Sequence, residues 1–273
     1  MINLGARNWA REVRSSYAFV ERNWNLTRRY WGWEIAFFIY RLASSLSVVY
    51  IGKAQGASGR ELIVFLTVGT LVWEYLSAVF SNIGEMIQWE RWEGTIEYTL
   101  MAPIRRTTQM LGTSIFAVLY GLVRTLLLFG AIALFFDLDL SRADYLSATV
   151  VLLAGSLSFI GIGIMASTLP LLFTERGGQM VFIIGSLLLL VSGVYYPISV
   201  LPVWMQWIAK VSPATYVLDG ARQSILQGAG LPALWGHLVI LLIIGVITIP
   251  LGVWFFIRIE VYAKRTGRLK RSG

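Results

Sequence analysis

The chain has 273 residues, of which 56% are hydrophobic and 14% are charged, and its mean hydropathy is +0.66. A soluble domain normally carries about 25% charged residues, so this composition excludes an ordinary soluble protein and favours an integral membrane protein. Cysteine is absent and histidine occurs once, as His237. These counts exclude disulfides, thiolate chemistry and a histidine cluster, and we expect no metal site.

Residues 1–30 form a basic and aromatic segment ahead of the first long apolar run. Tyr17, Val20, Trp24 and Arg28 recur at helical spacing, which predicts an amphipathic helix on the membrane surface with tryptophan at headgroup level. A partly disordered basic tail is the alternative. No cleavable signal peptide is indicated, because the apolar run that follows is of full spanning length and lacks a small-residue cleavage site.

Six apolar runs approach the length that a helix needs to cross about 30 Å of hydrocarbon. They are expected at residues 31–51, 62–84, 108–136, 146–173, 179–196 and 235–257. The predicted fold is therefore an all-α integral membrane protein, a single domain over 1–273. Its six-helix part covers 31–257 and is followed by a basic tail at 258–273.

The placement of Lys and Arg predicts the orientation of these spans. With the N-terminus inside, the inside segments hold sixteen Lys and Arg and the outside segments hold five, while Arg41 and Arg124 lie within spans. This asymmetry predicts a multi-pass protein of a bacterial-type inner membrane with both termini cytoplasmic. The net charge of +8 is then explained by topology and by contact with anionic membrane lipid, so we expect no nucleic-acid partner.

The segment Glu90–Pro103 is polar, although it lies between two long apolar runs. As a helix it would have an apolar face with Trp89, Trp92, Ile96 and Leu100. The opposite face would carry Glu90, Glu93 and Glu97. Gly94 allows a break between two short helices, and Pro103 ends the element. An apolar ridge with a carboxylate rim suits docking into the groove of a partner protein, and an interfacial helix without a partner is the alternative.

Two further segments stand out toward the C-terminus. In the fourth predicted span, small residues at 155, 156, 158, 161, 163 and 167 allow close helix packing, either within one chain or at a dimer seam. The connection 197–234 is long and apolar, and its piece 203–211 is too short to span. We predict a short helical pair bounded by Pro202 and Pro213 that re-enters the outer leaflet.

The sequence contains no G-x-x-x-x-G-K-[ST] loop that would cradle nucleotide phosphates. A Ser/His/Asp set cannot be built around a single histidine at a membrane edge. Neither ATP hydrolysis nor covalent catalysis is therefore expected of this chain.

Two sets of motifs resemble the type-2 ABC export permeases. Glu90-x-x-Glu-Gly-Thr-x-Glu97, followed by Ala102-Pro103, is similar to the cytoplasmic loop after the second helix of that family. The pattern around the fifth helix and the re-entrant hairpin of the family is matched by Ser192-Gly193-Val-Tyr-Tyr-Pro197, Leu201-Pro202-x-Trp204, Pro213-x-Thr215-Tyr216 and Asp219-Gly220-x-Arg222. Within that family, these motifs are most similar to those of the daunorubicin-resistance and multidrug branch. The polysaccharide and teichoic-acid branch usually carries an Arg-Asp pair where this chain reads Thr174-Glu-Arg-Gly-Gly-Gln179.

The resemblance implies a permease that works with a second permease chain, more often a homodimer than a heterodimer, and with two copies of a separate ABC ATPase. ATP and Mg would be bound by that ATPase, and this chain would hold no cofactor. Residues 1–30 would correspond to a connecting helix that also meets the ATPase. The coupling element would be formed by Glu90, Glu93, Gly94, Thr95, Glu97 and Pro103. The outer hairpin and gate would be formed by Tyr195, Tyr196, Pro197, Pro202, Trp204, Pro213, Tyr216 and Arg222.

The implied activity is ATP-driven export of a hydrophobic or amphiphilic compound, such as a drug, an antibiotic or a lipid. A permease for a lipid-linked polysaccharide or teichoic acid is one alternative, and a membrane scaffold without transport is another. The aromatic side chains of Tyr195, Tyr196, Trp204 and Trp207 fit either an interfacial belt or a surface that gates or stacks against the exported compound.

Arg41, Glu74 and Arg124 are ionisable residues near the middle of predicted spans. Placing a charged side chain at the centre of a membrane-spanning helix costs about 2.5–3.5 kcal/mol on insertion scales. We therefore expect these residues to face protein or water and to pair. Pairing Glu74 with one arginine leaves one positive charge over. The three residues then form either a structural ion pair or a site where one arginine selects an anionic or amphiphilic substrate on the transport path.

Overall fold

The computed structural model describes residues 9–54, 59–136 and 141–267. Within these ranges the structure contains helices and no strand, which confirms the predicted all-α class. The elements are α1 (Trp9–Arg29), α2 (Trp31–Lys53), α3 (Gly59–Gly84), α4 (Met86–Trp92), α5 (Ile96–Met101), α6 (Arg106–Ala133), α7 (Tyr145–Ala166), α8 (Thr168–Leu172), α9 (Gly177–Val191), the 3-10 turn η2 (Ile198–Val200), α10 (Val203–Val211), α11 (Pro213–Gln227) and α12 (Trp235–Arg265).

Five helical stretches among the described residues are long and apolar enough to cross a membrane. They are α2, Glu61–Gly84 of α3, α6, Tyr145–Leu172 comprising α7 and α8, and α12. The fifth predicted span, 179–196, corresponds to α9, whose 15 residues rise about 22 Å, short of the ~30 Å hydrocarbon core. The last helix runs to Arg265, so the predicted end at 257 is too early and residues 258–265 of the expected tail are helical. Residues 266–267 form a turn, and 268–273 lie outside the described residues.

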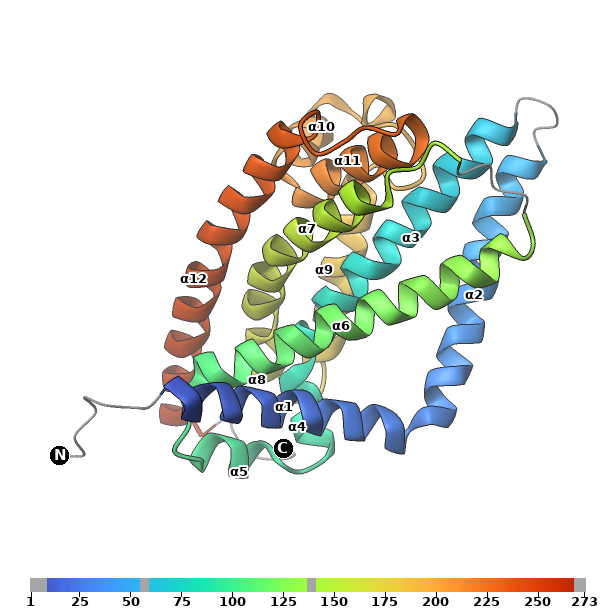
Figure 1. The fold of residues 1–273 in the computed structure, drawn as a ribbon. Coiled ribbons are helices and arrows are strands. Elements are labelled where there is room, and N and C mark those ends of the chain that lie inside the picture. The colour runs from blue at the N-terminus through green and yellow to red at the C-terminus, as the bar shows by residue number, and fades with distance from the viewer. Residues whose placement is uncertain (1–8, 55–58, 137–140, 268–273) are drawn as a thin grey trace.

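The two ends of the helical bundle carry different elements (Figure 1). The helix α1 runs across one end, where α4, α5 and the last turns of α12 also lie, whereas α10 and α11 lie at the opposite end. The helix predicted within residues 1–30 is confirmed for Trp9–Arg29, with Tyr17 and Trp24 exposed. Residues 1–8 of that segment lie outside the described part.

The centre of the bundle is built around α7, which packs along α12, α3 and α11. Its small residues permit these contacts, since Gly155 lies against Val217, Gly161 against Thr248 and Gly163 against Ile83. The hydroxyl of Ser158 also donates a hydrogen bond to the Leu241 carbonyl of α12, at 3.0 Å. At these positions, close packing within one chain is confirmed.

The helix α1 is held against α6 by a close approach at Gly112. A Cβ atom there would lie 2.3 Å from the Ser16 carbonyl oxygen and 2.7 Å from the Phe19 Cβ. The Ser16 hydroxyl donates to the Thr108 carbonyl at 3.3 Å. A side chain larger than hydrogen at Gly112 therefore cannot be accommodated without moving α1.

We expect Gly112→Ala to loosen α1 from the bundle, because its methyl group would overlap the α1 backbone. The matched control is Gly130→Ala in the same helix, where a Cβ meets nothing within 4 Å and alanine is favoured over glycine by about 1 kcal/mol. Limited proteolysis in detergent checks this prediction, with faster cleavage of α1 expected in Gly112→Ala alone. Equal cleavage rates in the two variants would contradict it.

Candidate functional site

The polar segment between α3 and α6 folds as two short helices, α4 and α5. Gly94 separates them with a φ of +69°, a left-handed conformation that glycine adopts without steric cost. The Thr95 amide donates to the Glu90 carbonyl at 2.9 Å and closes the turn. Since α5 ends at Met101, two residues before Pro103, the predicted break and the predicted end of the element are both confirmed.

The predicted division of this segment into an apolar face and a carboxylate face is wrong. Glu90 is 3% exposed and Ile96 is fully buried, whereas Trp92 is 69% exposed. The left-handed turn at Gly94 changes the direction of the chain, so the helical spacing of α4 does not continue into α5. Buried and exposed positions are therefore set separately in each short helix.

Glu90 points into the protein and binds side chains of α1 and α6. Its Oε1 accepts hydrogen bonds from Arg22 Nη1 at 2.7 Å and from Gln109 Nε2 at 2.9 Å. Burial raises the pKa of the Glu90 carboxyl, while the charge of Arg22 opposes this shift. Arg22 is a partner that the sequence analysis did not identify, because 68 residues separate it from Glu90.

The other predicted coupling residues lie nearer the surface. Glu93 is half-buried and accepts a hydrogen bond from the Tyr30 hydroxyl at 2.9 Å, Thr95 is half-buried, and Glu97 and Pro103 are exposed. The structure thus places the six residues in one compact segment but divides them between an internal contact, made by Glu90, and the surface.

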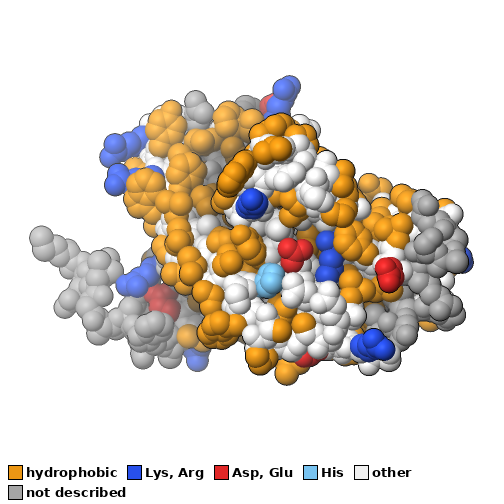
Figure 2. Space-filling model, turned by 90° about the horizontal axis from the view of Figure 1, so that it is seen from above, with side chains coloured by type: hydrophobic (Ala, Val, Ile, Leu, Met, Phe, Trp, Pro, Cys, Tyr) orange, Lys and Arg blue, Asp and Glu red, His pale blue; other side chains and the backbone are white. Residues whose placement is uncertain are grey.

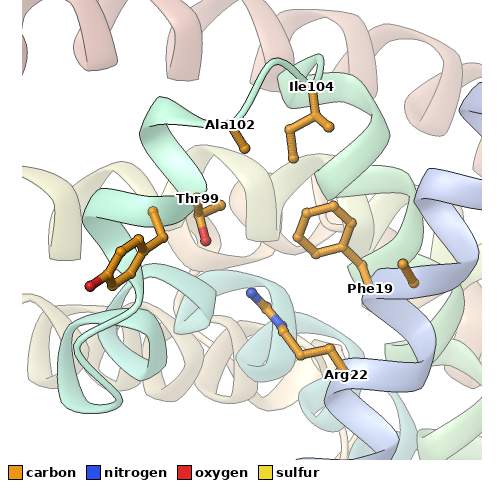
Figure 3. A pocket seen from close by; sticks show the side chains of 7 residues that line it. Phe19, Arg22, Thr99, Ala102 and Ile104 are labelled. Atoms are coloured by element: carbon orange, nitrogen blue, oxygen red, sulfur yellow. The ribbon is translucent and has the colours of Figure 1, made fainter.

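The outward side of α4 and α5 is apolar and aromatic. We call Trp89, Trp92, Tyr98 and Met101 the loop surface. Tyr98 and Met101 are each 74% exposed, and the rings of Trp89 and Trp92 meet edge to face with centroids 5.3 Å apart. A mostly apolar pocket of about 300 Å³ adjoins it, lined by Ala18, Phe19, Arg22, Tyr98, Thr99, Ala102 and Ile104 (Figure 3).

The helix α4 is anchored to the membrane helices by Arg91, which the sequence analysis counted only as a topology signal. Its buried guanidinium donates to the carbonyls of Pro170 and Leu171 at 3.2 and 3.1 Å. Burial lowers the pKa of Arg91. These contacts fix α4, and with it Trp89 and Trp92 of the loop surface, to α8.

At the opposite end, the connection after α9 forms the predicted helical pair. The helix α10 begins after Pro202, and α11 begins at Pro213. Most of α10 is exposed and apolar, including Trp204 and Trp207, while much of α11 is buried. In a view onto this end, apolar side chains surround a few charged ones (Figure 2).

The residues predicted for the outer hairpin stabilise its fold through backbone contacts. Arg222 donates to the carbonyls of Gly193 and Val194 at 3.1 and 2.8 Å, and its guanidinium stacks on Phe65. Tyr216 and Tyr196 donate to the carbonyls of Lys210 and Leu190, each at 2.7 Å. Tyr195 is half-buried, and Pro197 is exposed at the start of the hairpin.

The predicted intramembrane charges form two separate groups. Arg41 of α2 pairs with Glu74 of α3, with Nη1 and Oε2 2.5 Å apart. Arg124 instead donates to the Tyr120 hydroxyl at 2.7 Å, and that hydroxyl donates to Glu34 of α2. Glu74 thus pairs with Arg41, and Arg124 is the arginine left over from that pair; it contacts Tyr120, whose hydroxyl binds Glu34 of α2.

Glu85 lies directly after α3 and introduces a pH dependence. Burial raises the pKa of its carboxyl to about 7, against the attraction of Arg41. Because the folded-state pKa lies above the ordinary value, the protonated form contributes stability at low pH, and this is lost as the pH rises through about 7. We expect the stability in detergent, and with it Tm, to fall as the pH rises from about 5 to about 7, by at most ~1.4 kcal/mol per pH unit, and to level off above pH 7.

The matched variants for this prediction are Glu85→Gln and Glu97→Gln. Glutamine stays neutral, so Glu85→Gln should flatten the pH dependence of Tm, whereas the exposed Glu97 should change it little. The same slope in Glu85→Gln and in the wild-type chain would refute the assignment.

Comparison with known proteins adds to this geometry. Residues 16–226 match the family described as ABC-2 type transporter. The chain is 26% identical over 176 residues to the probable multidrug ABC transporter permease YbhR of Escherichia coli (strain K12). This alignment covers 62% of the chain and 47% of YbhR. It is also 26% identical over 175 residues to the putative transport permease YvfS of Bacillus subtilis (strain 168). This alignment covers 63% of the chain and 68% of YvfS. The chain thus spans about half the length of YbhR.

Proposed function

Because this chain belongs to the ABC-2 type transporter family, we propose that it is the membrane-spanning permease subunit of an ATP-driven exporter. Its family and its apolar helices make it a multi-pass membrane protein and a transport permease rather than an enzyme. The cargo in this proposal is a hydrophobic or amphiphilic compound, such as a drug, an antibiotic or a lipid. The name carried by the relative YbhR, a probable multidrug permease, supports that class of cargo.

The observation that carries the proposal is the loop surface. Exposed aromatic and apolar side chains in a short, rigidly anchored helical loop suit the groove of a partner protein. The sequence has no phosphate-binding loop of its own, so the partner we propose is a separate ABC ATPase that binds ATP and Mg. Two ATPase copies and a second permease chain complete the proposed assembly.

The proposal places the loop surface, α1 and the end of α12 in the cytoplasm, and α10 and α11 at the outer face. The charge distribution along the sequence supports this orientation. Because the chain has no cysteine, single-cysteine variants report sidedness directly. A membrane-impermeant maleimide applied to intact cells is expected to label Val200→Cys and to leave Tyr98→Cys unlabelled until the cells are opened. The reverse pattern would overturn the orientation.

Transport is tested by comparing a strain that lacks the chain with the same strain complemented by it. We expect lipid and metabolite profiling to show an amphiphilic compound that accumulates without the chain, and inside-out vesicles to take up that compound only when ATP is supplied. Accumulation of a lipid-linked polysaccharide would move the assignment to the other branch of the family. Normal profiles together with no associated ATPase would favour a scaffold.

A further inference from the structure

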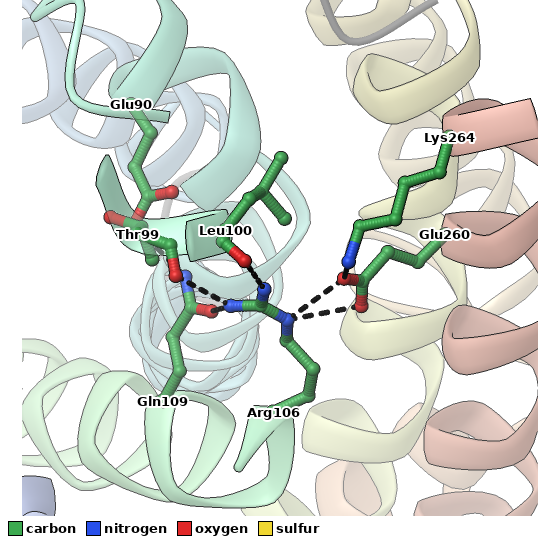
Figure 4. A network of polar contacts seen from close by, with 7 residues as sticks. All are labelled: Glu90, Thr99, Leu100, Arg106, Gln109, Glu260 and Lys264. Atoms are coloured by element: carbon green, nitrogen blue, oxygen red, sulfur yellow. Dashed lines mark hydrogen bonds and ion pairs between the residues drawn. The ribbon is translucent and has the colours of Figure 1, made fainter. Parts of the chain in front are cut away.

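Arg106, the first residue of α6, holds together elements that are far apart in the sequence (Figure 4). Its Nη1 and Nη2 donate to the carbonyls of Thr99 and Leu100 in α5, each at 2.9 Å. Its Nε lies 3.0 Å from both carboxylate oxygens of Glu260 in α12. The Arg106 and Glu260 side chains are only 11% and 6% exposed, so water screens this ion pair weakly.

The contacts of Arg106 continue into a network on both sides. On the α12 side, Lys264 lies 2.7 Å from the Glu260 carboxylate. On the other side, Gln109 accepts from Arg106 at 3.4 Å and donates to Glu90, which in turn binds Arg22 of α1. One continuous set of polar contacts therefore joins α1, α4, α5, α6 and α12.

The arginine side chain is suited to this position because its planar guanidinium presents five donors in a fixed arrangement. The carbonyls at the end of α5 have no partner within the helix and need external donors. The first residue of α5, Ile96, is fully buried in the hydrophobic core. The Arg106 side chain adds a polar connection between the other end of α5 and the membrane helices.

We propose that Arg106 is the positioning residue that transmits movement of the loop surface to α12. The inference rests on the proposed function, since an ATPase bound to the loop surface supplies the movement. A displacement of α5 shifts the two carbonyls bound to Arg106, and the same guanidinium carries that shift to Glu260. The last membrane helix and the loop surface then move as one body.

The first test measures the link without any partner. Amide hydrogen exchange of the full chain in lipid nanodiscs is compared for Arg106→Gln, Glu260→Gln and the control Arg105→Gln, which removes the same charge from the neighbouring, exposed residue. We expect at least about tenfold faster exchange in α5 in Arg106→Gln, a smaller increase in Glu260→Gln, and wild-type exchange in Arg105→Gln. Arg106→Lys should restore α5 only in part, because lysine cannot bind Glu260 and both carbonyls at once. Equal exchange in Arg106→Gln and Arg105→Gln would overturn the proposal.

The second test measures transmission in the complex with the ATPase. Spin labels at Val261→Cys in α12 and Phe182→Cys in α9, both exposed positions, report the distance between these helices with and without ATP. In the otherwise wild-type chain we expect ATP to change this distance, and in Arg106→Gln we expect less than about one third of that change while the ATPase remains bound. An unaltered change in Arg106→Gln would overturn the inference. A wild-type chain that binds no ATPase would refute the proposed function, while the exchange comparison would still decide whether Arg106 joins α5 to α12.

Discussion

Replacing Tyr98 and Met101 together with aspartate is expected to weaken binding of the ABC ATPase at least about 30-fold. Both side chains are 74% exposed on the loop surface, and large apolar or aromatic anchors at interfaces can contribute about 2 kcal/mol or more. New carboxylates there would have to be desolvated in an apolar groove. The affinity of the purified ATPase for the permease in nanodiscs measures the effect.

The matched control for this prediction is Val200→Asp, at a similarly exposed apolar residue that shortly precedes α10, the helix at the opposite end of the bundle. It introduces the same charge without touching the loop surface, so binding of the ATPase should be unchanged. Full binding by the Tyr98 and Met101 variant would show that the ATPase docks elsewhere.

Removing Glu74 while keeping Arg41 is expected to be the most damaging single change within the membrane helices. Glu74→Ala leaves a guanidinium in the membrane without its carboxylate, at a cost of about 3 kcal/mol. We expect strongly reduced abundance in membranes and a lower Tm in detergent. The double variant Arg41→Leu/Glu74→Leu removes both charges and should recover most of the loss.

The same series distinguishes a structural ion pair from a substrate contact. If Arg41 and Arg124 are structural, Arg41→Ala and Arg124→Ala should lower abundance and export together. Normal abundance with lost export in either variant would instead indicate that the arginine contacts the substrate.

The membrane helices could be predicted because the length of an apolar run determines whether it can span. The prediction was weakest where backbone geometry, not hydropathy, sets the boundary. The helix α9 ends at Val191, before a glycine with a φ of +72°, although the apolar sequence continues to Tyr196. The last helix extends beyond its apolar run because Glu260 is buried and paired with Arg106.

The sequence predicted the position of the segment that carries the loop surface, but not which of its side chains face outward. The prediction from helical spacing assumed that one helix direction continues over residues 90–103. The left-handed turn at Gly94 changes the direction of the chain within this segment. The inward position of Glu90 depends on Arg22 and Gln109, which come from two other helices. Likewise, Tyr120 links Arg124 to Glu34 of α2, and no spacing rule relates residues that meet across helices.

The loop surface is the proposed contact for the ATPase, and cross-linking from a single cysteine tests this contact most directly. In a chain with no natural cysteine, Tyr98→Cys and Val200→Cys are each treated with a short thiol-to-amine cross-linker in native membranes. We predict a covalent product between the permease and an ABC ATPase from Tyr98→Cys and none from Val200→Cys. A product from Val200→Cys alone, or the same yield from both positions, would contradict it.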